Sequence, residues 1–274
     1  MKEFLVKDHE ASWLPEGKWE MVWSDEFDGT ELDRTKWDYR MSMMQKPWQA
    51  WTDKGVHLDG KSSAVFSILE EDGKIVSSQL QTGYNFMDAV VEPSTFGNDQ
   101  LQWPIGRLKK NLFTHGPGYY ECRCRLQQME GWWSAFWIQS PNIGSTDDPA
   151  LSGVEIDVME SFHPGRIAGH NVFTGGYGHD SKRVKVGGTT VDETQWHRFG
   201  LLWDETGYTF FVDGVEDGKI TEHLTARPGF ILISTEVSGY RRANDNCTFT
   251  GNGVAAARAG DTFLVDYVRV FEKR

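Results

Sequence analysis

The chain has 274 residues, 39% of them hydrophobic, which is enough apolar material for one domain with a large core. Its 40 acidic residues outnumber its 28 Lys and Arg residues, and the net charge of -12 argues against nucleic acids and anionic membranes as partners. Three cysteines form neither a disulfide framework nor a Cys-x-x-Cys metal pattern, so we expect buried thiols.

The N-terminal stretch, residues 1–17, is expected to be an extension of a single domain that spans residues 1–274. It has neither the apolar segment nor the small-residue cleavage site of a signal peptide, and no later stretch resembles a transmembrane span. We therefore expect either a mature form from which a signal was removed or a cytoplasmic protein.

Alternating strand patterns recur along the chain with turn residues between them, whereas helical periodicity is scarce. Hairpin turns are expected at 71–74, 212–215 and 216–219. Many short strands without helices predict an all-β sandwich or barrel. The strands are expected within residues 118–128, 132–140, 153–162, 169–178, 197–204, 208–214, 230–239 and 261–272.

Two stretches without alternation, 86–112 and 143–151, are expected to be long loops. Trp48, Trp51 and Trp103 lie in loop-like sequence, where an exposed indole is unfavourable unless it binds something. They are candidates for contacts with a bound ligand.

The run LSGVEIDVMESF, residues 151–162, carries three acids in an otherwise apolar strand. Glu155 and Asp157 share one face because side chains alternate with period two, but Glu160 would point to the other face in a regular strand. A β-bulge in which the pair Val158–Met159 opposes one partner residue returns Glu160 to the acidic face. The pattern therefore predicts three acids on one face of a bulged strand.

Two carboxyl groups on one face can hydrolyse a glycosidic bond, since one protonates the leaving oxygen and the other attacks the anomeric carbon or activates water. Asp157 between them would raise the proton affinity of whichever glutamate is the acid. A solvated strand face is the alternative, but no Lys or Arg balances the three acids between residues 154 and 164. The stretch FILISTEVSG places Ser234 and Glu236 on one polar face, which we expect to look into the same cleft.

The E-I-D-V-M-E run resembles the bulged E-x-D-x-x-E signature of glycoside hydrolase family 16, found in laminarinases, agarases, porphyranases and carrageenases. Lichenases of that family carry the unbulged E-x-D-x-E. Similar motifs occur in family order at 23–37, 118–127, 131–139, 195–214 and 266–272. The resemblance implies a β-jelly roll of two curved antiparallel sheets with an open cleft on the concave face.

By this resemblance Glu155 is the nucleophile, Asp157 the assisting acid and Glu160 the general acid/base. Trp133 matches the family tryptophan that stacks on a sugar ring, with Ser134 in place of the usual proline; Trp132 and Trp137 are expected in the core. His170 resembles a cleft histidine that bonds sugar hydroxyls near the acid/base. Ser234 stands where an asparagine is common in the family, and Glu236 where an aromatic or small residue is common.

Many family members hold a structural Ca²⁺ on the convex side, through backbone oxygens near the first strand and after an early turn and through an Asp of the final strand. The matching positions here are Glu26, Gly60 and Asp266. Oxygen ligands of this kind suit Ca²⁺. We therefore expect no cofactor for catalysis and a possible structural calcium ion.

The function implied by the acidic face and the resemblance is that of a retaining endo-glycosidase. The substrate would be a polysaccharide or oligosaccharide with β-linkages, either a β-1,3-glucan such as laminarin or a β-galactan of the agar type. Trp48, Trp51 and Trp103 are candidates for its outer subsites. A transglycosylase using the same covalent intermediate and a non-catalytic sugar-binding jelly roll are the alternatives. The resemblance also implies a secreted or periplasmic protein, and we expect a monomer.

Overall fold

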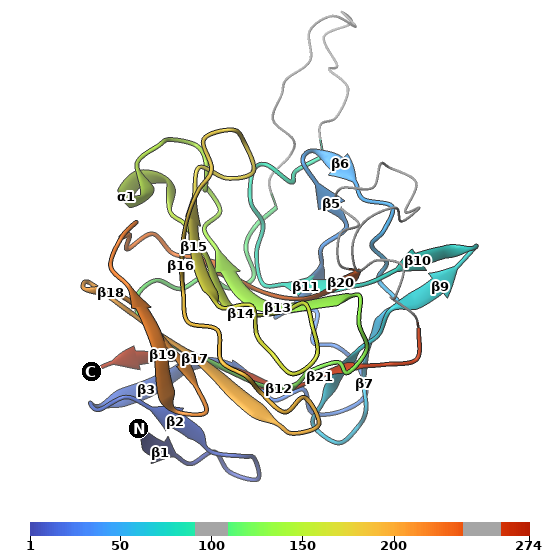
Figure 1. Cartoon of the computed structure of the whole chain (residues 1–274), viewed down its shortest axis with the longest axis horizontal. Helices are drawn as coiled ribbons and strands as arrows, with labels where there is room; N and C mark the ends of the chain where they lie inside the picture. The colour runs from blue at the N-terminus through green and yellow to red at the C-terminus, as the bar shows by residue number, and fades with distance from the viewer. Residues whose placement is uncertain (91–108, 238–258) are drawn as a thin grey trace, which may run out of the picture.

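The structure, a computed structural model, describes residues 1–90, 109–237 and 259–274. Two large antiparallel sheets lie face to face in the described parts of the chain (Figure 1). The first sheet has the strand order β16-β15-β14-β13-β20-β11-β4, and the second has the order β19-β18-β17-β12-β21-β8-β7, with β3 also paired to β21. The fold class predicted from the sequence, an all-β sandwich, is confirmed.

The strands of the first sheet are β4 (Asp38–Tyr39), β11 (Gln79–Gln81), β13 (Trp132–Gln139), β14 (Glu155–Ser161), β15 (His170–Thr174), β16 (Lys182–Val186) and β20 (Phe230–Val237). Those of the second are β3 (Trp19–Asp25), β7 (Val56–Leu58), β8 (Ala64–Phe66), β12 (Gly118–Arg125), β17 (His197–Asp204), β18 (Gly207–Val212), β19 (Val215–Ile220) and β21 (Phe263–Lys273). Three small hairpins pair β1 (Lys2–Phe4) with β2 (Ser12–Leu14), β5 (Ser42–Met43) with β6 (Lys46–Pro47), and β9 (Leu69–Glu71) with β10 (Lys74–Val76).

All eight strands predicted from alternation form, and six of them lie within about two residues of the expected limits. β12 ends three residues before the expected limit, at Arg125, and β15 ends four residues before it, at Thr174. The turns at 71–74 and 212–215 also form, with Asp-Gly pairs at positive φ. The turn expected at 216–219 is wrong, because β19 runs through it and Asp217 is the extra residue of a bulge opposite β18. Within the loop expected at 143–151 a single helical turn begins, α1 (Pro149–Ser152), capped by the Asp148 side chain.

The core lies between the two sheets, so the apolar residues that alternate along each strand are those that face the other sheet. On β14, Ile156, Val158 and Met159 are fully buried in it, and on β12 the thiols of Cys122 and Cys124 are buried there too. The expectation of buried thiols is confirmed for these two cysteines, whereas Cys247 lies outside the described residues. The acidic face of β14 therefore points away from the core, toward the outer side of the first sheet.

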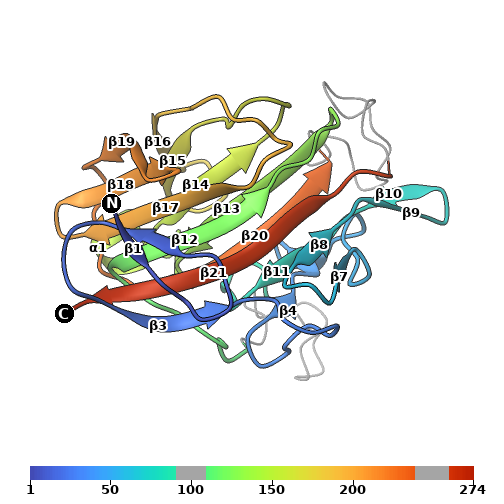
Figure 2. The same ribbon diagram turned by 90° about the horizontal axis from the view of Figure 1, so that it is seen from below.

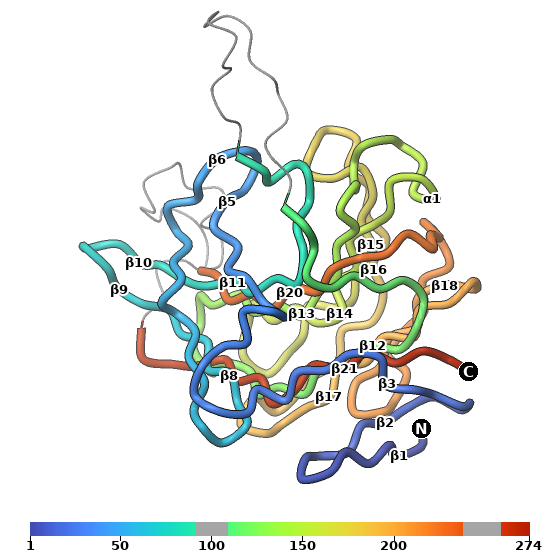
Figure 3. The backbone as a smooth tube through the Cα atoms, turned by 180° about the vertical axis from the view of Figure 1, so that it is seen from behind, coloured from blue at the N-terminus to red at the C-terminus, as the bar shows by residue number. Residues whose placement is uncertain are grey.

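The N-terminal hairpin lies on the outer face of the second sheet, on the side away from β14 (Figures 1 and 2). Trp13 donates its main-chain N–H to Glu121 of β12 at 3.0 Å, and Arg269 of β21 donates to the carbonyl of Glu10 at 2.7 Å. Figures 2 and 3 show both chain ends on this side of the molecule. The described residues contain no helix long and apolar enough to cross a membrane.

Candidate active site

The bulge predicted in β14 is present. Phe136 of β13 pairs with Met159 and the next residue, Trp137, pairs with Asp157, so Val158 is left without a partner on β13. This extra residue resets the alternation, and Glu155, Asp157 and Glu160 line one cavity of about 270 Å³. Asp157 is 5% exposed and Glu160 is 8% exposed, so these two carboxyl groups lie largely out of water.

Each oxygen of Glu160 accepts a hydrogen bond from a neighbouring strand. Trp133 of β13 donates its indole N–H to Oε1 at 3.1 Å, and Asn171 of β15 donates its amide to Oε2 at 2.6 Å. Trp133 is half-buried and its ring stacks on Phe162, with centroids 5.0 Å apart. Glu160 is thus held from both sides at the wall of the cavity.

Glu155 is held by a different group of residues. Gln139, directly opposite it on β13, donates its amide to Glu155 Oε2 at 2.6 Å. The same amide donates to the Tyr177 hydroxyl at 3.1 Å, and Tyr177 lines the cavity. Behind Tyr177 lies Arg40, which is 2% exposed and donates to the same hydroxyl at 2.5 Å.

The floor of the cavity is built by β13 and β20. Ser234 lines it, as predicted, and accepts the indole N–H of Trp137 at 3.1 Å. Trp132 is buried as expected, but Trp137 lines the cavity instead of the core between the sheets. Trp137 follows Trp133 at twice the strand period, so regular alternation along β13 could have placed it.

His170 does not face the cavity, and this expectation is corrected. Its side chain is fully buried between the sheets, where Nδ1 contacts the carbonyl of Val158 at 2.7 Å and Nε2 contacts Asp217 at 3.1 Å. The ring stacks on Phe210 with centroids 4.5 Å apart, and burial lowers the pKa of His170. Because neighbouring residues on a strand point to opposite faces, the residue that reaches the acids is Asn171.

The other predicted sugar contacts have different outcomes. Trp51 is 4% exposed and packs in a side core with the half-buried Trp48, so neither is the exposed loop indole that was expected. Glu236 is 1% exposed and accepts the Gln79 amide, which places it below the surface of the cleft. Trp103 lies outside the described residues.

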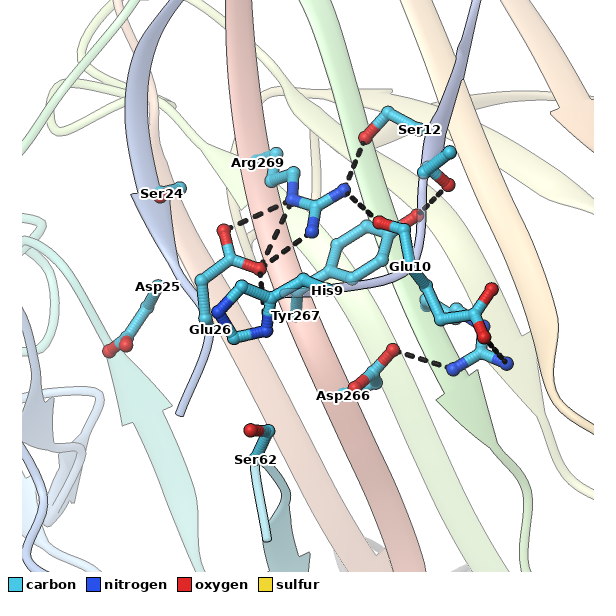
Figure 4. Close-up of polar contacts among 12 residues, drawn as sticks. His9, Glu10, Ser12, Ser24, Asp25, Glu26, Ser62, Asp266, Tyr267 and Arg269 are labelled. Carbon is cyan, nitrogen blue, oxygen red and sulfur yellow. Dashed lines mark hydrogen bonds and ion pairs between the residues drawn. The ribbon is translucent and has the colours of Figure 1, made fainter. Parts of the chain in front are cut away.

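Glu26 and Asp266, two of the three positions expected to hold calcium, lie beside β21 of the second sheet (Figure 4). The Asp266 carboxylate accepts a hydrogen bond from Arg123 Nη1 at 2.6 Å, and the Glu26 carboxylate accepts one from Arg269 Nη2 at 2.7 Å. His9 of the N-terminal extension lies 3.9 Å from the Glu26 carboxylate. Gly60 keeps a positive φ of 71°. Arg123 already neutralises Asp266, so the one carboxylate expected to bind the ion is not available to a divalent cation. Among the described residues, no three His, Cys, Asp or Glu side chains are grouped to hold a metal ion.

Comparison with known proteins agrees with the geometry. A sequence profile described as "Glycosyl hydrolases family 16" matches residues 106–246, which is more than half of the chain and includes the bulged strand. The chain belongs to glycosyl hydrolase family 16. The family resemblance inferred from the E-I-D-V-M-E run is therefore confirmed.

Relatives of this family 16 chain include a glucan endo-glucosidase and a beta-glucanase. Glucan endo-1,3-beta-glucosidase A1 of Niallia circulans is 25% identical over 269 residues, which are 93% of this chain and 38% of that protein. The beta-glucanase of Rhodothermus marinus is 29% identical over 202 residues, which are 71% of this chain and 63% of that protein. The chain thus spans less than two thirds of either relative.

Solved structures of the family share its jelly-roll fold. The laminarinase from Rhodothermus marinus superposes with a TM-score of 0.66 at 22% identity, covering 94% of this chain and 99% of that one. A mutant of SCLam, a non-specific endo-beta-1,3(4)-glucanase, superposes with a TM-score of 0.64 at 23% identity, covering 93% and 95% of the two chains. That mutant presents a 1,3-beta-D-cellobiosyl-glucose at its active site.

Proposed function

We propose that this family 16 chain is a retaining endo-glycosidase that hydrolyses internal β-1,3 or β-1,4 linkages of a glucan. The observation that carries the proposal is the bulge at Val158, which brings Glu155 and Glu160 into one cavity with Asp157 between them. The relatives named for β-glucan hydrolysis support the substrate class.

The reaction follows a double displacement. The Glu155 carboxylate attacks the anomeric carbon while the Glu160 carboxyl group protonates the glycosidic oxygen, so that the leaving chain departs and a glycosyl ester remains. Glu160 then removes a proton from water, the water attacks the anomeric carbon, and the ester bond to Glu155 breaks. Two inversions give net retention, and two carboxyl groups about 5–5.5 Å apart suit this course.

The surroundings of the two glutamates fit these separate roles. The Gln139 amide donates to Glu155, which favours an ionised nucleophile. Asp157, 5% exposed on the strand between the glutamates, disfavours a second negative charge at Glu160. Trp133 lines the cavity beside Glu160 and offers a ring face to the apolar side of a sugar.

A neutral glucan fits the wider site better than a sulfated galactan. A cavity of about 670 Å³ lies at the β4 end of the same sheet and is lined by three cations and three carboxylates. Arg34 and Lys109 both pair with Asp38, and Arg40 pairs with Asp88. A sulfate group would have to disrupt these ion pairs, whereas sugar hydroxyls can bond to them as they stand.

A panel of purified polysaccharides tests the proposal. We expect oligosaccharides of several lengths from laminarin or mixed-linkage β-glucan, and none from agarose, porphyran or carrageenan. Release of products only from the galactans would overturn the substrate class. Binding without any product would instead indicate the sugar-binding module, and longer products that appear when an acceptor sugar is added would indicate the transglycosylase.

Calcium is left out of this proposal because Arg123 already pairs with Asp266. Thermal unfolding with and without a chelator checks this, and a midpoint that falls on chelation would restore the ion. A secreted or periplasmic location stays a prediction of the family resemblance.

A further inference from the structure

Arg40, directly after β4, is a buried cation that the proposed reaction does not use. Its guanidinium lies over two indole rings, 5.0 Å from the centroid of Trp51 and 5.2 Å from that of Trp137. Burial of a charge is unfavourable unless it is paired. Here Asp88 Oδ2 accepts both Nε at 3.0 Å and Nη2 at 2.5 Å, which fixes the plane and the direction of the guanidinium.

Asp88 also fixes the direction of two side-chain amides. Its N–H donates to Asn85 Oδ1 at 2.8 Å, and its carboxylate accepts Asn85 Nδ2 at 2.9 Å, so the Asn85 amide has one orientation. Asn85 Nδ2 in turn donates to Gln139 Oε1 at 2.5 Å. The Gln139 nitrogen must therefore point the other way, toward Tyr177 and Glu155.

The Tyr177 hydroxyl consequently accepts two hydrogen bonds, from Arg40 Nη2 and from Gln139 Nε2. A phenolic oxygen has two acceptor sites and one proton, so its own O–H must be directed to a third partner. Burial raises the pKa of Tyr177 to about 12, which keeps this proton in place at neutral pH. Tyr177 lines the cavity that contains Glu155, and the same Gln139 nitrogen contacts both residues.

We propose that Arg40 and Gln139 hold Tyr177 as a fixed hydrogen-bond donor to the Glu155 carboxylate, so that the nucleophile stays ionised and oriented. This inference rests on the proposed function. Arg40 is a positioning residue that acts through Tyr177. Its own charge is balanced by Asp88, so the effect on Glu155 comes mainly through the hydroxyl. The titratable groups around Glu155 are Asp157 and Glu160 on β14, Tyr177 after β15, Arg40 after β4 and Asp88 in the loop after β11.

The variant Tyr177→Phe removes only the hydroxyl and leaves no buried charge unpaired. Donation to Glu155 stabilises its charged form, so without it Glu155 takes up a proton at higher pH. We expect kcat/KM on a β-glucan oligosaccharide to fall about 10- to 100-fold and its acid limb to move up by roughly one pH unit. Arg40→Lys should shift the limb in the same direction by less, and adding it to Tyr177→Phe should change the acid limb no further.

Tyr208→Phe is the matched control, because it also removes the hydroxyl of a buried tyrosine. Tyr208 lies on β18 of the second sheet, and its hydroxyl donates to the carbonyl of His223 at 2.9 Å. The substitution should lower stability and leave the acid limb in place. An unchanged acid limb in Tyr177→Phe, as in this control, would overturn the inference.

Titration of the free protein separates this inference from the proposed function. In ¹³C NMR of protein labelled at the glutamate carboxyl carbons, the Glu155 signal is identified by its loss in Glu155→Gln. We expect it to titrate at higher pH in Tyr177→Phe than in the natural chain. The same titration in both proteins overturns the inference even if hydrolysis is seen. A shift in a protein that hydrolyses no β-glucan supports the hydrogen bond and rejects the function.

Discussion

The two glutamates of the site differ in which residues hold them. Glu160 accepts hydrogen bonds from Trp133 and Asn171, which come from the strands on either side of β14. Glu155 is instead bound to Gln139, which connects it to residues of distant loops. Neutral donors therefore surround both carboxyl groups, and the difference in protonation that the reaction needs depends on Asp157 and on Tyr177.

Asn171→Leu removes one of the two donors to Glu160 at nearly constant volume. Because the amide favours the charged carboxylate, its loss should keep Glu160 protonated to higher pH. We expect the alkaline limb of the kcat/KM profile to move up by about one pH unit and the rate to fall about tenfold. A profile with the alkaline limb unmoved would mean that Glu160 is not the acid.

Particular residues show what sequence reasoning could reach. Period-two alternation plus one bulge was enough to place Glu155, Asp157 and Glu160 in one cavity, because both rules are local. His170 was placed wrongly because the family resemblance, and not alternation along this chain, suggested it; Asn171 lies directly opposite Asp157 and so shares the acidic face. Arg40 and Tyr177 meet across 137 positions of sequence, and no local pattern predicts such a contact.

The bulged strand is the element that sets the geometry. Val158 is its extra residue, and it is fully buried in the core together with Met159. Deleting Val158 would leave the spacing E-x-D-x-E, in which regular alternation already puts all three acids on one face. The bulge therefore has two roles: it keeps Glu160 on the same face as Glu155 although five positions separate them, and it places Val158 in the core.

We expect the Val158 deletion to fold with a loss of roughly 1–3 kcal/mol in unfolding free energy and to keep measurable hydrolysis. Deleting both Val158 and Met159 shifts Glu160 to the core face, and this control should have no activity. Assays of both deletions alongside urea unfolding would decide. If both deletion proteins fold and lose activity equally, the face on which Glu160 lies would not explain the activity.

At the scale of the whole molecule, the N-terminal extension packs on the outer face of the second sheet, the sheet that does not carry the active site. Glu121 of β12 is 1% exposed, and burial raises its pKa. It is satisfied by the Tyr267 hydroxyl at 2.7 Å and by the main chain of Trp13 at 3.0 Å. The carbonyl of Ala11 in the extension also accepts a hydrogen bond from Arg198 at 3.0 Å and lies 3.2 Å from the Tyr267 hydroxyl. The extension therefore stabilises the sheet opposite the active site.

Removing residues 1–14 should lower the unfolding free energy by roughly 2–5 kcal/mol, because buried polar groups lose their partners. Catalysis at low temperature should be nearly unchanged, since none of these contacts reaches β14. Removing residues 1–7 keeps the contacts of residues 10–13 and is the matched control. Urea unfolding and kcat/KM measured on both truncations test this, and a stable 15–274 fragment would count against it.

The most direct test of the account is the anomeric configuration of the first product, followed by proton NMR during hydrolysis of a β-glucan oligosaccharide. If Glu155 attacks the sugar and Glu160 protonates the leaving oxygen across one bond, the new reducing end appears as the β-anomer and only later mutarotates. Initial release of the α-anomer would show a single inversion and would contradict the pairing of the two glutamates.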